Sequence, residues 1–226
     1  MICETYQNAE SLKNEVVISC SDEKTGIQAL KHLQVEVMQK GKNEKKDPEY
    51  VRNGTTCLIA SRNVLSGKIN SFLLNDTRTE YDYLSHIQSI VSTDLTKKHI
   101  IICDQLNTHK SESLVRWIAQ NIGYEGDLGE KSKFGILKSQ QSRMEFLEDH
   151  SHSIRFLYTP KHCSWMNQIE NWFGCLERKL IKKGEFSSVE LLNSKISSFI
   201  MYYNEHLAKS YAWSFSGEKF RVKLTI

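Results

Sequence analysis

The chain has 226 residues, which is enough for one large domain or two small ones with a sizeable core. Its apolar fraction of 39% and charged fraction of 25% are typical of globular proteins. No apolar run approaches the roughly 20 residues that a membrane span needs, and the N-terminus lacks the basic and apolar regions of a secretory signal. We therefore expect no membrane partner and a cytoplasmic or nuclear location.

The first part of the chain predicts three strands joined as an antiparallel meander. Residues 1–14 are polar and weakly helical, and residues 38–54 are charged and rich in turn formers. Asn53 and Gly54 are a hairpin-type turn signal within that expected loop. Apolar and β-branched runs predict the strands at residues 16–21, 55–60 and 68–74.

The middle of the chain predicts helices alternating with two further strands. Apolar residues recur at helical spacing over 80–91 and 111–122, and Ser111 is placed to cap the second helix. Between them, residues 99–103 form a β-branched run typical of a central strand covered on both faces. Residues 123–150 are irregular apart from a short helix over about 139–148, and residues 154–158 predict another strand.

The last third of the chain is expected to be helical. One helix is predicted over 165–182 with Gly184 as its stop, and Ser164 is a candidate cap for it. A capping box at Ser187 with Glu190 predicts a second helix that runs to about residue 204. Strands followed by helices in this order predict a mixed α/β sheet with helices on its faces.

The six cysteines form no C-x-x-C pair, and several lie inside strand-like apolar runs. We therefore expect buried free thiols rather than a redox or metal motif. A zinc site remains the alternative for the group His150, His152, His162 and Cys163, although its spacing matches no standard zinc pattern.

Three acidic residues stand at the ends of apolar stretches, and this is the most informative pattern in the sequence. Asp22 follows the strand at 16–21, Asp104 follows the strand at 99–103, and Glu170 lies beside the apolar face of the predicted helix. Brought together by the fold, three carboxylates would form an oxygen-only site for hard cations such as Mg²⁺ or Mn²⁺. Two such ions can drive in-line attack on a phosphodiester.

Each carboxylate also has a purely structural interpretation. Asp22 precedes Glu23-Lys24-Thr25-Gly26 and could only start a turn. Glu170 could be an exposed helix residue, and the tryptophans beside it, Trp165 and Trp172, are expected in the core.

Polar and basic residues near the acids are candidates for contact with DNA. Net charge is only +3, so phosphate binding would depend on local Lys and Arg. The basic run at 178–183 is informative because it follows Glu170 on the same predicted helix. Loop capping remains the alternative for Asn107 and His109. The candidates are Asn107, His109, Lys161, His162, Asn167, Arg178 and Lys179.

Three blocks of the sequence resemble the acidic blocks of bacterial insertion-sequence transposases in the mariner-related branch of the DDE superfamily. They are DEKTGIQAL at 22–30, CDQLNTHK at 103–110 and YTPKHCSWMNQIENWF at 158–173. The segments EYVRNGT at 49–55 and YNEH at 203–206 are also similar to that family. The resemblance covers the chain from about residue 15 to residue 217, and the third block is its most specific part.

The resemblance implies a ribonuclease-H-like catalytic domain over 15–217, between a lead segment at 1–14 and a tail at 218–226. Its fold would be a mixed five-stranded sheet with helices on both faces. Asp22, Asp104 and Glu170 would be the catalytic and metal-binding triad, holding two Mg²⁺ or Mn²⁺ ions roughly 3.5–4 Å apart. Members usually carry an N-terminal helix-turn-helix region, so we expect a catalytic fragment or a truncated copy.

The expected activity is metal-dependent cleavage of DNA at transposon ends, followed by strand transfer into target DNA. The resemblance further implies a TA target dinucleotide, a homodimer in the DNA complex, and a nucleoid-associated location in the cytoplasm. Two rivals remain open. One is an inactive remnant that serves as a DNA-binding or assembly domain, and the other is a nuclease that cuts without strand transfer.

Overall fold

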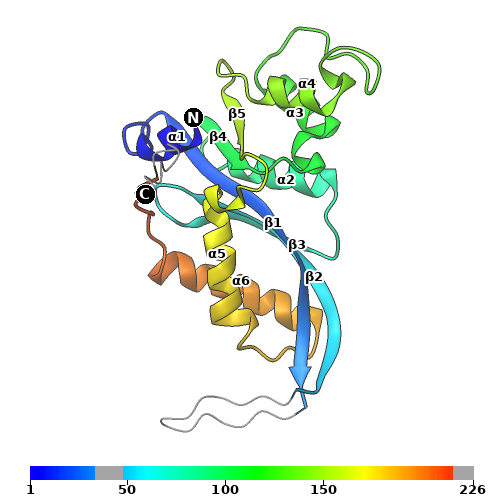
Figure 1. Ribbon diagram of the computed structural model, residues 1–226, viewed down its shortest axis with the longest axis vertical. Helices are drawn as coiled ribbons and strands as arrows, with labels where there is room; N and C mark the ends of the chain where they lie inside the picture. Colours follow the sequence, from blue (N-terminus) through cyan, green and yellow to red (C-terminus); the bar gives the residue numbers. More distant parts are fainter. Residues whose placement is uncertain (34–47, 216–226) are drawn as a thin grey trace, which may run out of the picture.

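The computed structural model describes residues 1–33 and 48–215, and one five-stranded sheet runs through it (Figure 1). The strand order is β3-β2-β1-β4-β5. Neighbours β1, β2 and β3 are antiparallel, whereas β4 and β5 follow β1 in parallel. The strands are β1 (Val16–His32), β2 (Tyr50–Asn63), β3 (Ile69–Asn75), β4 (Lys98–Cys103) and β5 (Ile154–Tyr158). The expected mixed five-stranded sheet is confirmed.

Helices cover both faces of this sheet, as expected (Figure 1). Successive side chains of a strand point to opposite faces, and β4 supplies Ile100 and Ile102 to one apolar cluster and Ile101 to the other. The first cluster includes residues of α1, α5 and α6, and the second includes residues of α2, α3 and α4. The helices are α1 (Ile2–Gln7), α2 (Glu80–Val91), α3 (Glu112–Asn121), α4 (Gln140–Leu147), α5 (Gln168–Leu176) and α6 (Val189–His206).

Strand β1 is much longer than the sequence predicts. The chain does not leave the sheet after residue 21, because Asp22 pairs with Ala60 and the strand continues to His32. Beyond the ends of both β4 and β3, β1 and β2 extend together as a two-stranded ribbon (Figure 1). Asp22 therefore lies in the middle of a strand, and the interpretation of residues 22–26 as a turn is wrong.

The Asn53-Gly54 pair is also not a hairpin turn, because both residues lie inside β2. Between the pairs Gln28–Thr55 and Leu30–Arg52, β2 carries one more residue than β1, which makes a bulge. Gly54 has a φ of 109°, and the Asn53 side chain donates to the Phe186 carbonyl. The same turn-forming residues therefore bend a strand here. The rest of the loop expected over 38–54 lies largely outside the described residues.

The predicted helices of the middle region are confirmed, and so is the predicted cap at Ser111. Helix α2 has the bounds expected for it, and the Ser111 hydroxyl accepts from the Leu114 amide at the start of α3. Ser139 begins α4 with a reciprocal cap to Ser142, inside the segment that otherwise has little regular structure.

The helix expected over 165–182 is instead three pieces. A 3₁₀ turn (Ser164–Met166) precedes α5, and α5 continues into a π-helical segment (Glu177–Ile181). Asn167, rather than Ser164, is the N-cap residue of α5. For the last helix the predicted cap is one residue early, because Ser188 and not Ser187 accepts from the Leu191 amide.

A buried arginine joins the two ends of the chain's last third. Arg62 on β2 is fully buried, and it donates to the Gln168 side chain at 2.5 Å and to the Lys209 carbonyl at 2.6 Å. Its guanidinium lies 3.8 Å from the centre of the Tyr211 ring. The segment after α6 is thus bonded to the start of α5 through one side chain.

The cysteines follow the sequence expectation. All six are free, four of them are buried, and Cys163 and Cys175 are half-buried. Across the described residues, no helix has both the length and the apolar character to cross a membrane.

We expect Gly54→Ala to destabilise the protein more than Gly26→Ala. Both glycines have positive φ, so each substitution adds backbone strain of about 1 kcal/mol. An added Cβ at Gly54 would also lie 2.7 Å from Val189 Cγ2, whereas none of the described atoms lies within 4 Å of a Cβ at Gly26. The extra overpacking should cost a further 1–3 kcal/mol or so. Free energies of unfolding from urea titration measure the difference, and equal losses would contradict it.

Candidate active site

The parallel register of β1 and β4 brings two of the three acids together. The last residues paired between these strands are Cys20 and Ile102, and Asp22 and Asp104 each follow two positions later. Side chains two positions apart point to the same face, and Cys20 and Ile102 belong to the apolar cluster that contains α5. Both acids therefore face the helix that carries Glu170.

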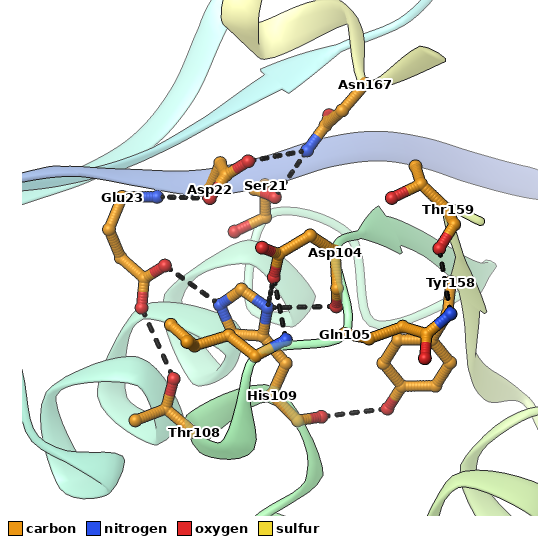
Figure 2. Close-up of polar contacts among 11 residues, drawn as sticks. Ser21, Asp22, Glu23, Asp104, Gln105, Thr108, His109, Tyr158, Thr159 and Asn167 are labelled. Carbon is orange, nitrogen blue, oxygen red and sulfur yellow. Dashed lines mark hydrogen bonds and ion pairs between the residues drawn. The ribbon is translucent and has the colours of Figure 1, made fainter. Parts of the chain in front are cut away.

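Asp22 is buried, with 7% of its surface exposed. Its Oδ1 accepts from the Glu23 amide at 2.8 Å, and its Oδ2 accepts from Asn167 Nδ2 at 3.2 Å (Figure 2). Burial, followed by the negative charges of Asp104 and Glu170, raises the pKa of Asp22 to about 7. The three carboxylates are thus close enough for each to act on the charge of the others.

Asp104 is more open and more strongly bonded. Its side chain is 41% exposed, and its Oδ1 faces His109 Nδ1 at 2.8 Å and accepts from the Leu106 amide at 2.9 Å. Burial alone would raise the pKa of Asp104, but the hydrogen bond and positive charge of His109 outweigh it and lower that pKa. Asp104 is therefore the acid of the pair that ionises first.

Glu170 lies in the first turn of α5 and is exposed. Burial raises its pKa, Lys24 opposes that rise, and Asp104 adds to it, so the net shift is upward. Lys24 also forms an ion pair with Glu177 at 3.2 Å. Lys24 is a basic neighbour of the site that the sequence analysis did not single out, although it follows Asp22 by two residues and shares its face.

Five of the seven residues expected to contact DNA are exposed: Asn107, Lys161, His162, Arg178 and Lys179. Two of them border a cavity beside the acids. This cavity has a volume of about 360 Å³ and opens between the ends of β4 and β5. Its lining includes Asp104, Leu106, Thr159, Pro160, Lys161 and His162.

The other two candidates, His109 and Asn167, cannot contact DNA in this structure because both are fully buried. Asn167 instead donates to the Ser21 carbonyl at 3.0 Å and to Asp22. It occupies the N-cap position of α5, yet its side chain makes no cap bond there. The capping residue has therefore been turned away from its own helix and toward a triad carboxylate.

The two tryptophans near Glu170, Trp165 and Trp172, lie in different environments. Trp172 is fully buried, as expected, but Trp165 is 50% exposed and stacks on Trp213 with the ring centres 6.2 Å apart. The expectation of a core position for Trp165 is wrong, because it belongs to the 3₁₀ turn ahead of α5 and not to the buried face of that helix.

The chemistry of the acids fits a hard divalent cation. Their donors are all carboxylate oxygens, the kind that Mg²⁺ and Mn²⁺ prefer. Asn167 Oδ1, next to Asp22, is buried and has no hydrogen-bond partner among the described residues. In residues 1–33 and 48–215, however, no three His, Cys, Asp or Glu side chains lie close enough to hold one ion as they stand. The acids are neighbours rather than a closed cage.

Carboxylates gathered where β1 passes the end of β4, beside a cavity bordered by basic side chains, are of the kind that enzymes acting on phosphodiesters use. The comparisons with known proteins name the family. The model of the DDE superfamily endonucleases matches residues 17–193, and the chain belongs to that family. A second model, that of the integrase core domain, matches residues 170–223. The sequence-based identification of the superfamily is thereby confirmed.

Similar solved structures include two from Mos1. The Mos1 mariner paired end complex with Mn has a TM-score of 0.33 and 12% identity, covering 93% of this chain and 62% of that one. The Mos1 strand transfer complex has a TM-score of 0.33 and 13% identity, covering 89% and 57%. This chain therefore spans less than two thirds of the length of those proteins. No curated protein is significantly similar to it in sequence.

We expect Asp22→Asn to become increasingly stabilising, relative to the wild type, as the pH rises from about 4 to about 7 without divalent metal. An unfolded Asp ionises near pH 3.9, whereas the pKa of folded Asp22 is about 7. The favourable contribution of the protonated acid is complete below pH 4 and is lost as pH rises through the folded pKa. Asn cannot ionise and escapes this loss.

Urea denaturation of both proteins across this pH range measures the effect. Glu10→Gln, which changes an exposed acid near the N-terminus, is the control and should give a nearly constant difference. A difference for Asp22→Asn that does not change with pH would contradict the environment described here.

Proposed function

We propose that residues 15–217 are the catalytic domain of a DDE transposase, which cleaves DNA at transposon ends and transfers the cut strand into target DNA. The observation that carries the proposal is the placing of Asp22 and Asp104 on one sheet face, opposite the helix that bears Glu170. The family assignment supports phosphodiester chemistry, and the mutual effect of the three charges supports a shared site.

In this proposal Asp22, Asp104 and Glu170 together hold two Mg²⁺ or Mn²⁺ ions. Such ions, when bound, would polarise the phosphodiester and favour both the attacking and the leaving oxygen. Asp104 is best prepared for this role because it is already ionised and its carboxylate is fixed by Leu106 and His109. Glu170, at an exposed position on α5, has the freedom to swing toward the other two acids.

Basic side chains around the acids would hold the DNA. Lys161 and His162 border the same cavity as Asp104, so a phosphate bound by them would lie beside the carboxylates. Asn107 is exposed nearby at the start of a 3₁₀ turn (Asn107–Lys110). Arg178 and Lys179 follow α5 in the π-helical segment and would contact the backbone further along. Active assembly as a homodimer on DNA, with a TA target, is part of this proposal.

The second candidate is an inactive relative that binds DNA or assembles with other copies. The observation that favours it is the open arrangement of the acids. Among the described residues, no three such side chains can hold an ion without movement. The two candidates share the DNA-binding surface and differ only in whether the acids close on a cation.

We expect the purified protein to cut and join DNA duplexes that carry the terminal sequences flanking its gene, in the presence of Mn²⁺. Asp104→Ala should reduce cutting by more than about 100-fold, because loss of a direct ligand exceeds the 10–100-fold cost of losing an outer partner. Gel analysis of cut and joined strands measures both reactions, with Glu10→Gln as the control that keeps full activity.

Circular dichroism should show that Asp104→Ala is folded. Cutting without joined products would identify a nuclease rather than a transposase. Binding of the same DNA by the wild type without metal-dependent cutting would support the inactive relative and overturn the proposed activity.

A further inference from the structure

A buried chain of polar contacts lies directly beneath the acids. His109 Nδ1 is 2.8 Å from Asp104 Oδ1, and His109 Nε2 is 3.1 Å from Glu23 Oε2 (Figure 2). The His109 side chain is completely buried, and the Glu23 side chain is 1% exposed. A carboxylate therefore faces each ring nitrogen, Glu23 in a region closed to solvent and Asp104 at its open edge. The Nδ1 atom also bonds the main-chain carbonyl of Asp104 at 3.1 Å.

The histidine ring has little freedom to move. It lies against the Tyr83 ring with their centres 4.1 Å apart. The main chain beside it is held as well, because the Tyr158 hydroxyl donates to the His109 carbonyl at 2.8 Å. Glu23 is steadied in turn by the Thr108 hydroxyl, which lies 3.4 Å from its Oε1. A ring fixed in this way can impose its own orientation on whatever it bonds.

This series of contacts connects β1, which carries Asp22, with Asp104 at the end of β4. Glu23 follows Asp22 on β1, so the two side chains point to opposite faces of the sheet. Asp22 faces α5, and Glu23 faces the α2 side, where Tyr83 and His109 lie. Through His109, Glu23 is bonded to Asp104 at the end of β4. The separation of the two triad acids is thus set from behind the sheet.

As a consequence, the two carboxylate oxygens of Asp104 have different surroundings. Oδ1 meets both His109 Nδ1 and the Leu106 amide. Within the described part of the chain, no protein group bonds Oδ2. The bonds on Oδ1 fix the plane of the carboxylate and leave Oδ2 available on the side of Asp22.

We infer that His109 and Glu23 are positioning residues, which hold Asp104 so that its unbonded oxygen faces the shared carboxylate site. This inference rests on the proposed function, because it concerns the cation site of that reaction. Outer partners that orient metal ligands are general, and their loss weakens metal affinity or activity by about 10–100-fold. Neither residue touches the reacting DNA, since both are buried.

The test is Mn²⁺ affinity, measured by calorimetric titration of the folded protein without DNA. His109→Ala should weaken Mn²⁺ binding by about 10–100-fold, and Glu23→Gln, which retains an acceptor oxygen, by about 10-fold. His99→Ala is the matched control: His99 is also buried on β4, but its ring bonds the Asp94 carbonyl at the opposite end of the strand. That variant should bind Mn²⁺ like the wild type although it loses a similar buried ring.

Thermal unfolding without metal separates stability from affinity. If His109→Ala does not fold, Glu23→Gln decides the question. Wild-type affinity in the folded His109 or Glu23 variants, with binding lost in Asp104→Ala, would overturn the positioning role and leave the proposed function intact. If Asp104→Ala binds Mn²⁺ as the wild type does, the cation site itself fails, and both conclusions fail with it.

Discussion

Carboxyl groups held close together in a partly buried place are the constraint on which this structure depends. The parallel pairing of β1 with β4 sets Cys20 level with Ile102. Asp22 and Asp104, each two positions later, therefore lie side by side on one face. Separate carboxylates would avoid one another, because neighbouring charges of the same sign disfavour ionisation. The sheet imposes their proximity, and the side chains around them must make it tolerable.

Different neighbours make it tolerable for each acid. Asp22 receives hydrogen bonds from a backbone amide and from Asn167, yet burial keeps it reluctant to ionise. Asp104 faces His109, whose own pKa burial would lower, but bonds to Asp104, Cys103 and Glu23 raise that pKa well above its usual value. Cys103 has a pKa raised by burial and stays a neutral thiol, so the negative charge facing the ring comes from the two carboxylates. With a pKa of about 7, Asp22 is thus partly protonated at neutral pH, whereas Asp104, whose pKa is lowered, is charged.

Most elements of the fold and the three acids of the candidate site could be predicted from the sequence. Runs such as 99–103 and helical spacing over 80–91 identify elements because burial on one or both faces leaves a direct periodic signal. The predicted triad came from acids at the ends of such runs. The length of β1 could not be predicted, since residues 22–26 are polar or glycine and the pairing of this part with β2 depends on bulges at glycines that also form turns.

The roles of Glu23, His109 and Asn167 could not be predicted from the sequence, for a different reason. Each is a polar residue in a segment that reads as a loop or a helix start, where exposure is the usual state. Their burial arises only when β1, the 3₁₀ turn after β4 and the start of α5 meet in three dimensions. Alternation along β1 predicts that Glu23 points to the face of the sheet opposite to that of Asp22, but no feature of the sequence identifies His109 as its partner.

The buried guanidinium of Arg62 has a consequence for how the last third of the protein packs. Its partners are the first residue of α5 and a carbonyl at residue 209, more than 140 positions later in the chain. Without the segment at residue 209 the buried guanidinium would lose that carbonyl and keep the Gln168 acceptor, and a poorly compensated charge in a protein interior is strongly unfavourable. The packing of the helix that bears Glu170 against the sheet is therefore coupled to the packing of the segment that follows α6.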